Sequence, residues 1–359
     1  MIKYIDEYRD KNLVDEIIKK IKARSRKHIT LMEVCGGHTM AIQKFGIPYL
    51  LPDNIKLVSG PGCPVCVSSK QYIDKAIALC RLDNVIITTY GDLIRVPGST
   101  SSLDKEKAAG RDIRIVYSVL DALKLAQTNP DKKVVFLGIG FETTAPGNAV
   151  AVDNAKKQNI KNFFLFSSHK IMPPAMGALI EDGVKINAYL APGHVSTITG
   201  TSIYNFIPEK YGLSVVIAGF EPIDILLSVY MIVKQIEENR PAVEIQYRRA
   251  VRPEGNIIAK QFMDKVFTLR DDWWRGFGNI PKSGLGLNDN FKDFDAEINF
   301  DVIPEPTKED KGCICGEILK GLKTPEECKL FKKVCTPLNP AGACMVSTEG
   351  ACHAYFKYR

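Results

Sequence analysis

Short apolar runs recur along the first 240 residues, and each is followed by a polar or glycine-containing turn and then by a stretch of helical periodicity. An apolar run of about four to eight residues bounded by turn residues is typical of a buried strand, whereas apolar residues three and four apart indicate an amphipathic helix. We therefore predict strands at residues 29–33, 55–59, 85–90, 113–117, 163–166, 186–190 and 215–218, and a further strand that begins at Val134.

Helices are predicted between these strands. The chain opens with a helix for which Asn12 is available as the N-cap and whose apolar face is formed by Leu13, Val14, Ile17, Ile18 and Ile21. Further helices are predicted through residues 41–44, 73–79 and 119–127. The stretch from Pro97 to Arg111 is rich in Ser, Gly, Lys and Asp, which is typical of a long exposed loop.

The alternation of strands and helices predicts an α/β fold with mostly parallel sheets. We expect two Rossmann-like parallel-sheet α/β domains, residues 1–130 and residues 131–240, that face each other across a cleft. A Gly-Phe-Glu triplet at the end of an apolar strand occurs at residues 140–142 and again at 219–221, which is weak support for two related halves. Beyond residue 241 the pattern becomes irregular, and the C-terminal region 241–359 ends in a small cysteine-rich domain.

Composition is that of an ordinary globular protein. Of the 359 residues, 45% are hydrophobic and 25% are charged, and the formal net charge of +7 comes from positive residues scattered along the chain. Nucleic-acid binding would need a concentrated basic stripe, so it is not expected. The N-terminus lacks the apolar segment of a signal peptide and no window approaches about 18 apolar residues, so we expect a cytoplasmic protein without a membrane partner.

Ten cysteines in a reducing compartment favour metal ligation or redox chemistry over a disulfide framework. Four of them lie before residue 81, six lie after residue 312, and none lies between. Cys80 lies on a predicted helix in apolar company, so we interpret it as structural.

The turn Cys35-Gly36-Gly37-His38 follows the strand at residues 29–33 and precedes a helix. Turns of this kind, at the ends of strands in open α/β sheets, are where ligand sites form. A thiol and an imidazole here could hold a soft metal ion, and the simpler alternative is a buried structural cysteine beside a surface histidine.

Cys63 and Cys66 form a C-x-x-C motif between a strand and a helix. A thiolate at a helix N-terminus is stabilised by free amides, so the pair could cycle between dithiol and disulfide. The alternative is half of a zinc site, which Cys35 and His38 would complete.

The C-terminal cysteines are the most specific signal. Four thiolates suit zinc or an iron–sulfur cluster, and the wide spacing favours the cluster because structural zinc usually uses closely paired cysteines. With 14, 6 and 16 residues between them, the four are Cys313, Cys328, Cys335 and Cys352. Cys315 and Cys344 lie close enough in sequence to replace a ligand or to form a second dithiol.

Polar residues also follow the later strands. Glu142, Thr143 and Thr144 follow a Gly-Ile-Gly turn, but there is neither a G-x-G-x-x-G nor a Gly-Lys-Ser/Thr motif, so a standard nucleotide site is excluded. Thr143 could simply cap a helix. His169 and His194 each close a predicted strand, where a histidine is more often a satisfied polar group than a functional one.

As a set, these motifs resemble the HypD family of [NiFe]-hydrogenase maturation proteins over essentially the whole chain. The resemblance is carried by Cys35-Gly-Gly-His38-Thr39, Gly60-Pro-Gly-Cys63-Pro-Val-Cys66, Gly140-Phe-Glu142-Thr143-Thr144, Pro192-Gly-His194-Val-Ser196 and the C-terminal cysteine spacing. It implies two α/β domains plus a domain with a [4Fe–4S] cluster. It also implies a redox-active scaffold on which an iron carrying CN and CO ligands, Fe(CN)₂CO, is assembled together with the chaperone HypC, with cyanide received from HypE.

The resemblance also implies roles for individual residues. Cys35 would hold the iron together with a cysteine of HypC, and His38 could ligate it or bond to its ligands. Cys63 and Cys66 would be a redox pair, and the cluster ligands would be Cys313, Cys328, Cys335 and Cys352. Glu142, Thr143, Thr144 and His194 join the candidate site through the motifs that contain them.

Two other functions remain open from the residues alone. One is a self-contained iron–sulfur-dependent thiol–disulfide oxidoreductase in which Cys35 is only structural. The other is a zinc-stabilised binding protein without electron transfer.

Overall fold

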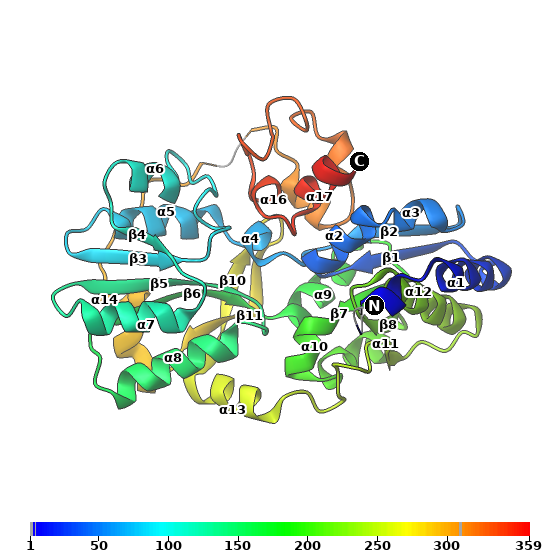
Figure 1. Cartoon of the computed structure of the whole chain (residues 1–359), viewed down its shortest axis with the longest axis horizontal. Coiled ribbons are helices and arrows are strands. Elements are labelled where there is room, and N and C mark those ends of the chain that lie inside the picture. The colour runs from blue at the N-terminus through cyan, green and yellow to red at the C-terminus, as the bar shows by residue number, and fades with distance from the viewer. Residues whose placement is uncertain (1–2, 4, 309–310) are drawn as a thin grey trace.

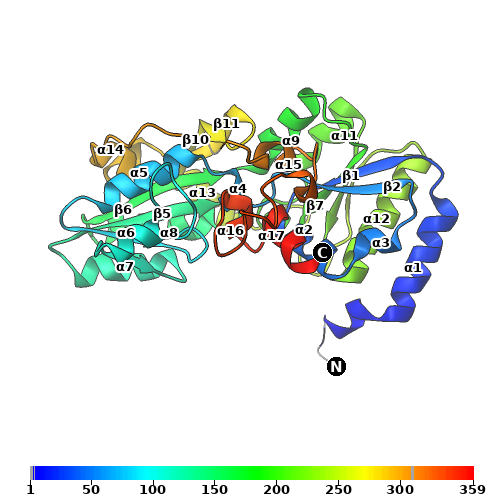
Figure 2. The same cartoon turned by 90° about the horizontal axis from the view of Figure 1, so that it is seen from above.

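The computed structural model describes residue 3, residues 5–308 and residues 311–359. It contains two sheets that lie side by side, and the C-terminal cysteine-rich segment covers the junction between them (Figures 1 and 2). Both sheets are dominated by parallel pairs, which confirms the predicted α/β class.

The first sheet, sheet A, has five parallel strands. Their order is β2 (Ile55–Ser59), β1 (Ile29–Glu33), β7 (Ala188–Pro192), β8 (Ser214–Ala218) and β9 (Val243–Ile245). One face packs against helices that include α1 (Lys11–Arg24), α2 (Gly36–Lys44) and α12 (Pro222–Glu237). The strands predicted at residues 29–33 and 55–59 are confirmed with the same bounds.

The second sheet, sheet B, has six strands. Their order is β10 (Phe267–Trp274), β11 (Gly278–Leu287), β6 (Phe163–Lys170), β5 (Lys133–Gly140), β3 (Val85–Thr89) and β4 (Ile113–Ile115). The hairpin β10–β11 pairs antiparallel to β6, whereas the other pairs are parallel. We expected irregular chain beyond residue 241, and this hairpin corrects that expectation. Its strand β10 alternates poorly because only Phe267 and Trp274, at its two ends, are buried.

The two sheets do not divide the chain into consecutive halves. Strands β1 and β2 join β7 to β9 in sheet A, while β3 to β6 join the late hairpin in sheet B. Each sheet therefore combines segments from distant parts of the sequence, and the expected units 1–130 and 131–240 do not each contain a sheet of their own. One continuous core includes Tyr189 of sheet A, Val135 of sheet B and Cys344 of the C-terminal segment.

Local signals explain where helices begin. Helix α1 starts at Lys11 because the Asp10 carboxylate accepts from the backbone N–H of Leu13 at 3.0 Å, so Asp10 rather than the expected Asn12 is the N-cap. Ile17, Ile18 and Ile21 are buried as predicted, whereas Leu13, which we also placed on the apolar face, is exposed. Within the expected loop 97–111, Ser102 caps helix α6 (Leu103–Ala108), which buries Leu103.

The remaining helices of the two sheet regions connect the strands or cover the sheets. They are α3 (Ile47–Leu50), α4 (Pro64–Val67), α5 (Lys70–Cys80), α7 (Val119–Thr128), α8 (Ala145–Lys157), α9 (Met172–Glu181), α10 (Gly193–Thr199), α11 (Phe206–Tyr211), α13 (Ile257–Val266) and α14 (Ala296–Asn299). Short 3₁₀ turns are η1 (Asp6–Arg9), η2 (Ser202–Tyr204) and η3 (Asp289–Phe294).

The C-terminal segment is built from short helices and turns. Its elements are α15 (Cys315–Leu319), η4 (Pro325–Glu327), α16 (Ala343–Val346) and α17 (Ala351–Tyr358). Helix α17 packs on α2 and helix α16 packs on α4, so this segment contacts the turns after both β1 and β2. Figure 1 shows α16 and α17 above the region where the two sheets meet.

Candidate functional site

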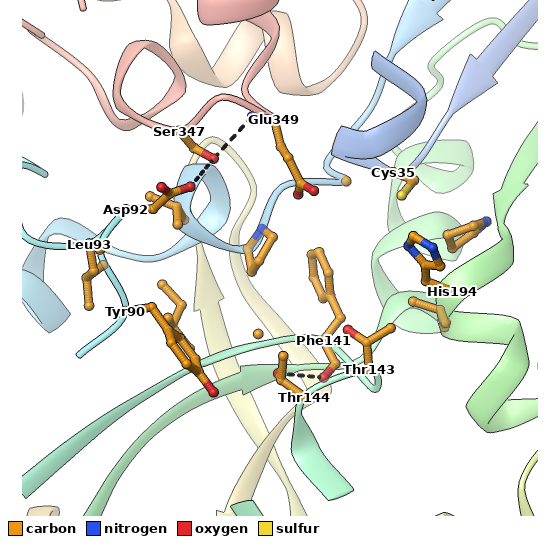
Figure 3. Close-up of a pocket in the computed structure, with 18 of the residues that line it drawn as sticks. Cys35, Tyr90, Asp92, Leu93, Phe141, Thr143, Thr144, His194, Ser347 and Glu349 are labelled. Atoms are coloured by element: carbon orange, nitrogen blue, oxygen red, sulfur yellow. Dashed lines mark hydrogen bonds between the residues drawn. The ribbon is translucent and has the colours of Figure 1, made fainter. Parts of the chain in front are cut away.

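A cavity of about 620 Å³ lies where the carboxyl ends of strands from both sheets meet the C-terminal segment. Parallel strands place their ligand sites at this end. Sheet A contributes Val34, Cys35, Gly62, Pro64, Val65, Pro192, His194 and Val195, and sheet B contributes residues of the turns after β3, β4 and β5. In Figure 3, Cys35 and His194 lie on one side, Tyr90 and Leu93 lie on the other, and Ser347 and Glu349 of the C-terminal segment lie above.

Cys35 is half-buried at the N-cap of α2, with its thiol at the cavity wall (Figure 3). Its backbone N–H donates to Glu33 Oε2 at 3.1 Å, and the Thr39 hydroxyl donates to Glu33 Oε1 at 2.5 Å. The N–H of Gly36 donates to the carbonyl of Gly62 at 2.9 Å. A buried carboxyl and a neighbouring turn therefore fix the backbone that carries the thiol.

Burial keeps the Cys35 thiol protonated. Desolvation, followed by the nearby charge of Glu349, raises its pKa to about 12, although the backbone N–H groups of His38 and Gly37 act in the opposite direction. Desolvation also raises the pKa of Glu33 to about 8. A soft cation bound to the sulfur would supply the positive charge that stabilises a buried thiolate.

Close packing around Cys35 requires glycine at three positions, two in the Cys35 turn and one in the turn before Cys63. A β-carbon on Gly36 would lie 2.5 Å from Cβ of Glu349, and one on Gly62 would overlap the backbone of Cys35. A β-carbon on Gly37 would lie 3.1 Å from the Phe220 ring and 3.7 Å from Cys35 Sγ. The Cys35 turn therefore contacts the C-x-x-C turn, the C-terminal segment and Phe220 without intervening side chains.

His38 is fully buried and is not among the residues that line the cavity. Its Nε2–H donates to the carbonyl oxygens of Gly219 at 2.9 Å and Ala218 at 3.3 Å, which fixes the tautomer. Desolvation lowers its pKa to about 4, so the ring is neutral, and its Nδ1 has no hydrogen-bond partner among the described residues.

His194 is the imidazole that lines the cavity. It lies in the first turn of α10 and stacks on Phe220, with ring centroids 4.0 Å apart. Desolvation lowers its pKa, which favours the neutral ring. His169, by contrast, lies within β6 rather than closing it, and its ring is buried against Asn148 and Ser167.

Of the motif residues Glu142, Thr143 and Thr144, the two threonines lie at the cavity and the glutamate lies in the core. Thr143 and Thr144 line the cavity, and the Thr144 hydroxyl donates to the carbonyl of Phe141 at 3.2 Å. Glu142 is buried outside the cavity, where its Oε1 accepts from the N–H of Met172 at 3.0 Å at the start of α9. Desolvation raises its pKa to about 7.

Cys63 and Cys66 are joined by a disulfide, with their α-carbons 5.2 Å apart, and both are buried. Cys63 is the N-cap of α4, and its sulfur accepts from the N–H of Cys66 at 3.3 Å. The residues between them, Pro64 and Val65, line the cavity. With its sulfurs joined, the pair offers no free thiolates for the zinc half-site that we considered.

All six C-terminal cysteines line one apolar pocket together with Ile318, Leu330, Phe331 and Met345. Cys315 Sγ lies 2.9 Å from Cys344 Sγ, and the Cys315 side chain also hydrogen-bonds to that of Cys313. The N–H of Ala341 donates to Cys335 Sγ at 3.3 Å. Among the described residues, no three His, Cys, Asp or Glu side chains converge as the ligands of a single metal ion.

The donor set of this pocket fits a [4Fe–4S] cluster. The pocket gathers six thiols, and such a cluster takes four thiolates. Burial raises the pKa of Cys335 and Cys352, so a cationic group is needed to hold them as thiolates. The residues that would hold it are Cys313, Cys328, Cys335 and Cys352.

Several cavity residues were not predicted from the sequence. The Ser347 hydroxyl donates to Asp92 Oδ2 at 3.0 Å, and Glu349 lies against Gly36, so the C-terminal segment forms part of the cavity wall (Figure 3). Asp92 lies in the turn after strand β3, separated from it by Tyr90 and Gly91, and that position could have marked it. Ser347 and Glu349 belong to no motif, and only the fold brings them to Cys35.

Comparison with known proteins gives consistent matches over the whole length. The HypD family profile, described as "Hydrogenase formation hypA family", matches residues 11–359. The hydrogenase maturation factor HypD2 of Bradyrhizobium diazoefficiens is 47% identical over 368 residues, covering 99% of this chain and 97% of that protein. HypD of Azotobacter vinelandii is 45% identical (99% and 97% covered), and HypD of Escherichia coli is 44% identical (100% and 98% covered).

The family profile and these relatives place the chain among proteins with a role in hydrogenase maturation. Within that class, the chain belongs to the HypD family. In the part of the chain that the structure describes, no helix is both long and apolar enough to cross a membrane.

Proposed function

We propose that this protein is the redox-active scaffold on which the Fe(CN)₂CO group of [NiFe]-hydrogenase is assembled. The observation that carries this proposal is the Cys35 thiol at the wall of a cavity of about 620 Å³. Iron bearing CN and CO is the substrate, and the Cys35 thiolate holds it, because a soft sulfur ligand complements low-spin Fe(II). The protein acts in the cytoplasm.

Other cavity residues supply polar contacts around the iron. His194 offers an imidazole nitrogen, and Thr143 offers a hydroxyl group to the nitrogen ends of cyanide. Gly62 and Gly140 also line the cavity, and a β-carbon on them would collide with Cys35 and Thr144, respectively. Glu142, buried behind them, holds the start of α9 and does not contact the iron.

Assembly needs electrons, and two sulfur pairs lie along a path to the cavity. Helix α16 carries Cys344 and packs on α4, the helix that contains Cys66 of the C-x-x-C motif. Opening the Cys63–Cys66 disulfide takes two electrons and two protons and gives two thiols, and Cys315 with Cys344 can supply both by becoming a disulfide. A [4Fe–4S] cluster, when bound, supplies single electrons.

The partners in this proposal are a HypC-type chaperone and a HypE-type cyanide donor. A cavity bounded by two sheets and the C-terminal segment leaves Cys35 half-buried, so a second thiolate for the iron must come from a partner that reaches into the opening. The HypC-type chaperone supplies that thiolate, and the HypE-type protein delivers cyanide to the same cavity.

A second candidate function is an iron–sulfur-dependent thiol–disulfide oxidoreductase, which the Cys63–Cys66 disulfide favours. Such an enzyme must present its sulfurs to the disulfide of another protein. Cys63 and Cys66 are only 3% and 0% exposed, so they are better placed to exchange electrons within this chain. We therefore prefer the scaffold.

The test is anaerobic copurification of the chain with a HypC-type chaperone, followed by infrared spectroscopy. CN and CO stretching bands are expected on the wild-type complex and on Cys80→Ala, which alters a buried cysteine that does not line the cavity. The bands are expected to vanish in Cys35→Ala. Retention of the bands and of hydrogenase maturation by Cys35→Ala would overturn the proposal.

A further inference from the structure

Three aromatic rings form one stack behind the cavity wall. Phe220 lies between two imidazoles, with its centroid 4.6 Å from that of His38 and 4.0 Å from that of His194. The interplanar angles of 22° and 23° make both contacts stacked. The three rings come from the turns after β1, β8 and β7, which are neighbouring strands of sheet A in the order β1-β7-β8.

The inner end of the stack is fixed. His38 is fully buried, and its Nε2–H donates to the carbonyls of Ala218 and Gly219, the two residues that precede Phe220. The Phe220 ring also meets Tyr247 edge to face, with centroids 5.9 Å apart. Gly37 lets this ring approach, because a β-carbon there would lie 3.1 Å from it. Phe220 therefore has little freedom to move.

The outer end of the stack is held by Phe220. His194 is exposed to the cavity, and in the part of the chain that the structure describes its ring makes no hydrogen bond. The stacking contact at 4.0 Å is thus what orients this imidazole. Stacked rings keep to a narrow range of mutual orientations, so this contact holds the imidazole plane nearly parallel to the Phe220 ring.

We propose that Phe220 is a positioning residue for the assembly site: anchored by His38, it holds the His194 imidazole toward the cavity where Cys35 binds the iron. In this view the two histidines of the HypD motifs have different tasks. His38 supports the stack from inside, and His194 faces the substrate. This inference rests on the proposed function for the identity of the substrate. The ring stack is an observation that does not depend on that function.

The first test uses the chain alone and observes His194 by NMR. The ring protons of His194 are shifted upfield by the Phe220 ring current, and we expect Phe220→Leu to remove that shift while Phe220→Tyr keeps it. Phe206→Leu is the matched control, because it removes another aromatic pair, with Tyr211, away from the cavity. Unchanged His194 signals in Phe220→Leu would overturn the proposal.

The second test measures the CN and CO bands on chain copurified with a HypC-type chaperone. We expect band intensity per chain to fall about 2- to 10-fold in Phe220→Leu and to be restored in Phe220→Tyr, at equal melting temperature. Gly37→Ala, which pushes on the Phe220 ring, is expected to act in the same direction. Equal losses in the Leu and Tyr variants would contradict a role for the aromatic face.

The two proposals fail in different ways. If the wild-type complex has no CN and CO bands, the scaffold function is wrong, and the His194 signals still decide whether Phe220 orients the ring. If the bands are present and Phe220→Leu alters neither the bands nor the His194 signals, the scaffold stands and the positioning role is wrong.

Discussion

Gly62 lies backbone to backbone against Cys35, and a β-carbon on Gly62 would overlap the amide nitrogen of Cys35. The same two turns are joined by the hydrogen bond from Gly36 N–H to the Gly62 carbonyl. The C-x-x-C motif and the proposed iron-binding thiol are therefore parts of one rigid unit.

We predict that Gly62→Ala destabilises the protein by about 3 kcal/mol, because the backbone of Cys35 cannot move aside without losing its hydrogen bonds. Urea unfolding monitored by circular dichroism measures the change. Gly147→Ala is the control: it lies in α8 with open space around it and should stabilise by about 0.5–1 kcal/mol. Equal stabilities for the two variants would contradict the packing argument.

Glu142 predicts a pH dependence of stability. Its pKa in the folded protein, about 7, lies above the ordinary value of 4.5, so its favourable contribution is complete below pH 4.5 and is lost as the pH rises through about 7. A glutamine at this position cannot ionise, and its amide oxygen can still accept from the N–H of Met172. Glu142→Gln should therefore avoid up to about 3 kcal/mol of the loss in unfolding free energy at high pH. Denaturation of both proteins at pH 5 and pH 8.5 measures how the free energy of unfolding changes with pH. The fall between the two pH values should be larger for the wild type than for Glu142→Gln.

The C-terminal cysteines should separate into two groups. Cys335→Ser is expected to abolish the brown iron–sulfur absorption after anaerobic purification, because it removes one of four ligands. Cys315→Ser is expected to keep it, because Cys315 is not among the four proposed ligands and its Sγ lies 2.9 Å from Cys344 Sγ. Iron content per chain is the second readout, and loss of iron in Cys315→Ser would reassign the ligand set.

Breaking the C-x-x-C pair should block function without removing the cluster. Cys63→Ser is expected to keep the visible absorption and to abolish hydrogenase maturation in cells, because the disulfide can no longer form. Cys80→Ser is the control, since a serine there can still donate to the carbonyl of Ile77, as Cys80 does at 3.0 Å. Normal maturation with Cys63→Ser would exclude the relay.

The hydrogen bond from Ser347 to Asp92 should couple the C-terminal segment to sheet B. A double-mutant cycle with Ser347→Ala and Asp92→Asn is expected to give a coupling of about 1 kcal/mol in the free energy of unfolding. Either variant should also speed alkylation of Cys35, because Glu349 then covers it less well. A coupling near zero would mean that the segment is held by its apolar contacts alone.

Much of the local structure could be predicted because it depends on local signals. The strands at residues 29–33 and 55–59 are short apolar runs, and the face of α1 follows its periodicity. Pairing could not be predicted in the same way. Nothing in the run before Cys35 specifies that its second neighbour is β7 rather than β3, because that choice depends on contacts between distant segments.

The site shows the same limit. Cys35, Thr143 and His194 were found because they stand at strand ends in recognisable motifs. His38 belongs to a motif too, but only the carbonyls of Ala218 and Gly219 reveal that its ring points away from the cavity. Glu349 carries no local signal, since its place depends on α17 packing on α2.

The interleaved strand order also determines when each strand can find its partner during synthesis. Strands β1 and β2 leave the ribosome first, but β1 has no partner on its other edge until β7 has been made. The parallel part of sheet B, from β3 to β6, is synthesised in the interval. An open strand edge can pair with other chains, so the nascent protein is most vulnerable to aggregation during this interval. The sheet that carries Cys35 is thus begun first but is not complete until β9 has been made.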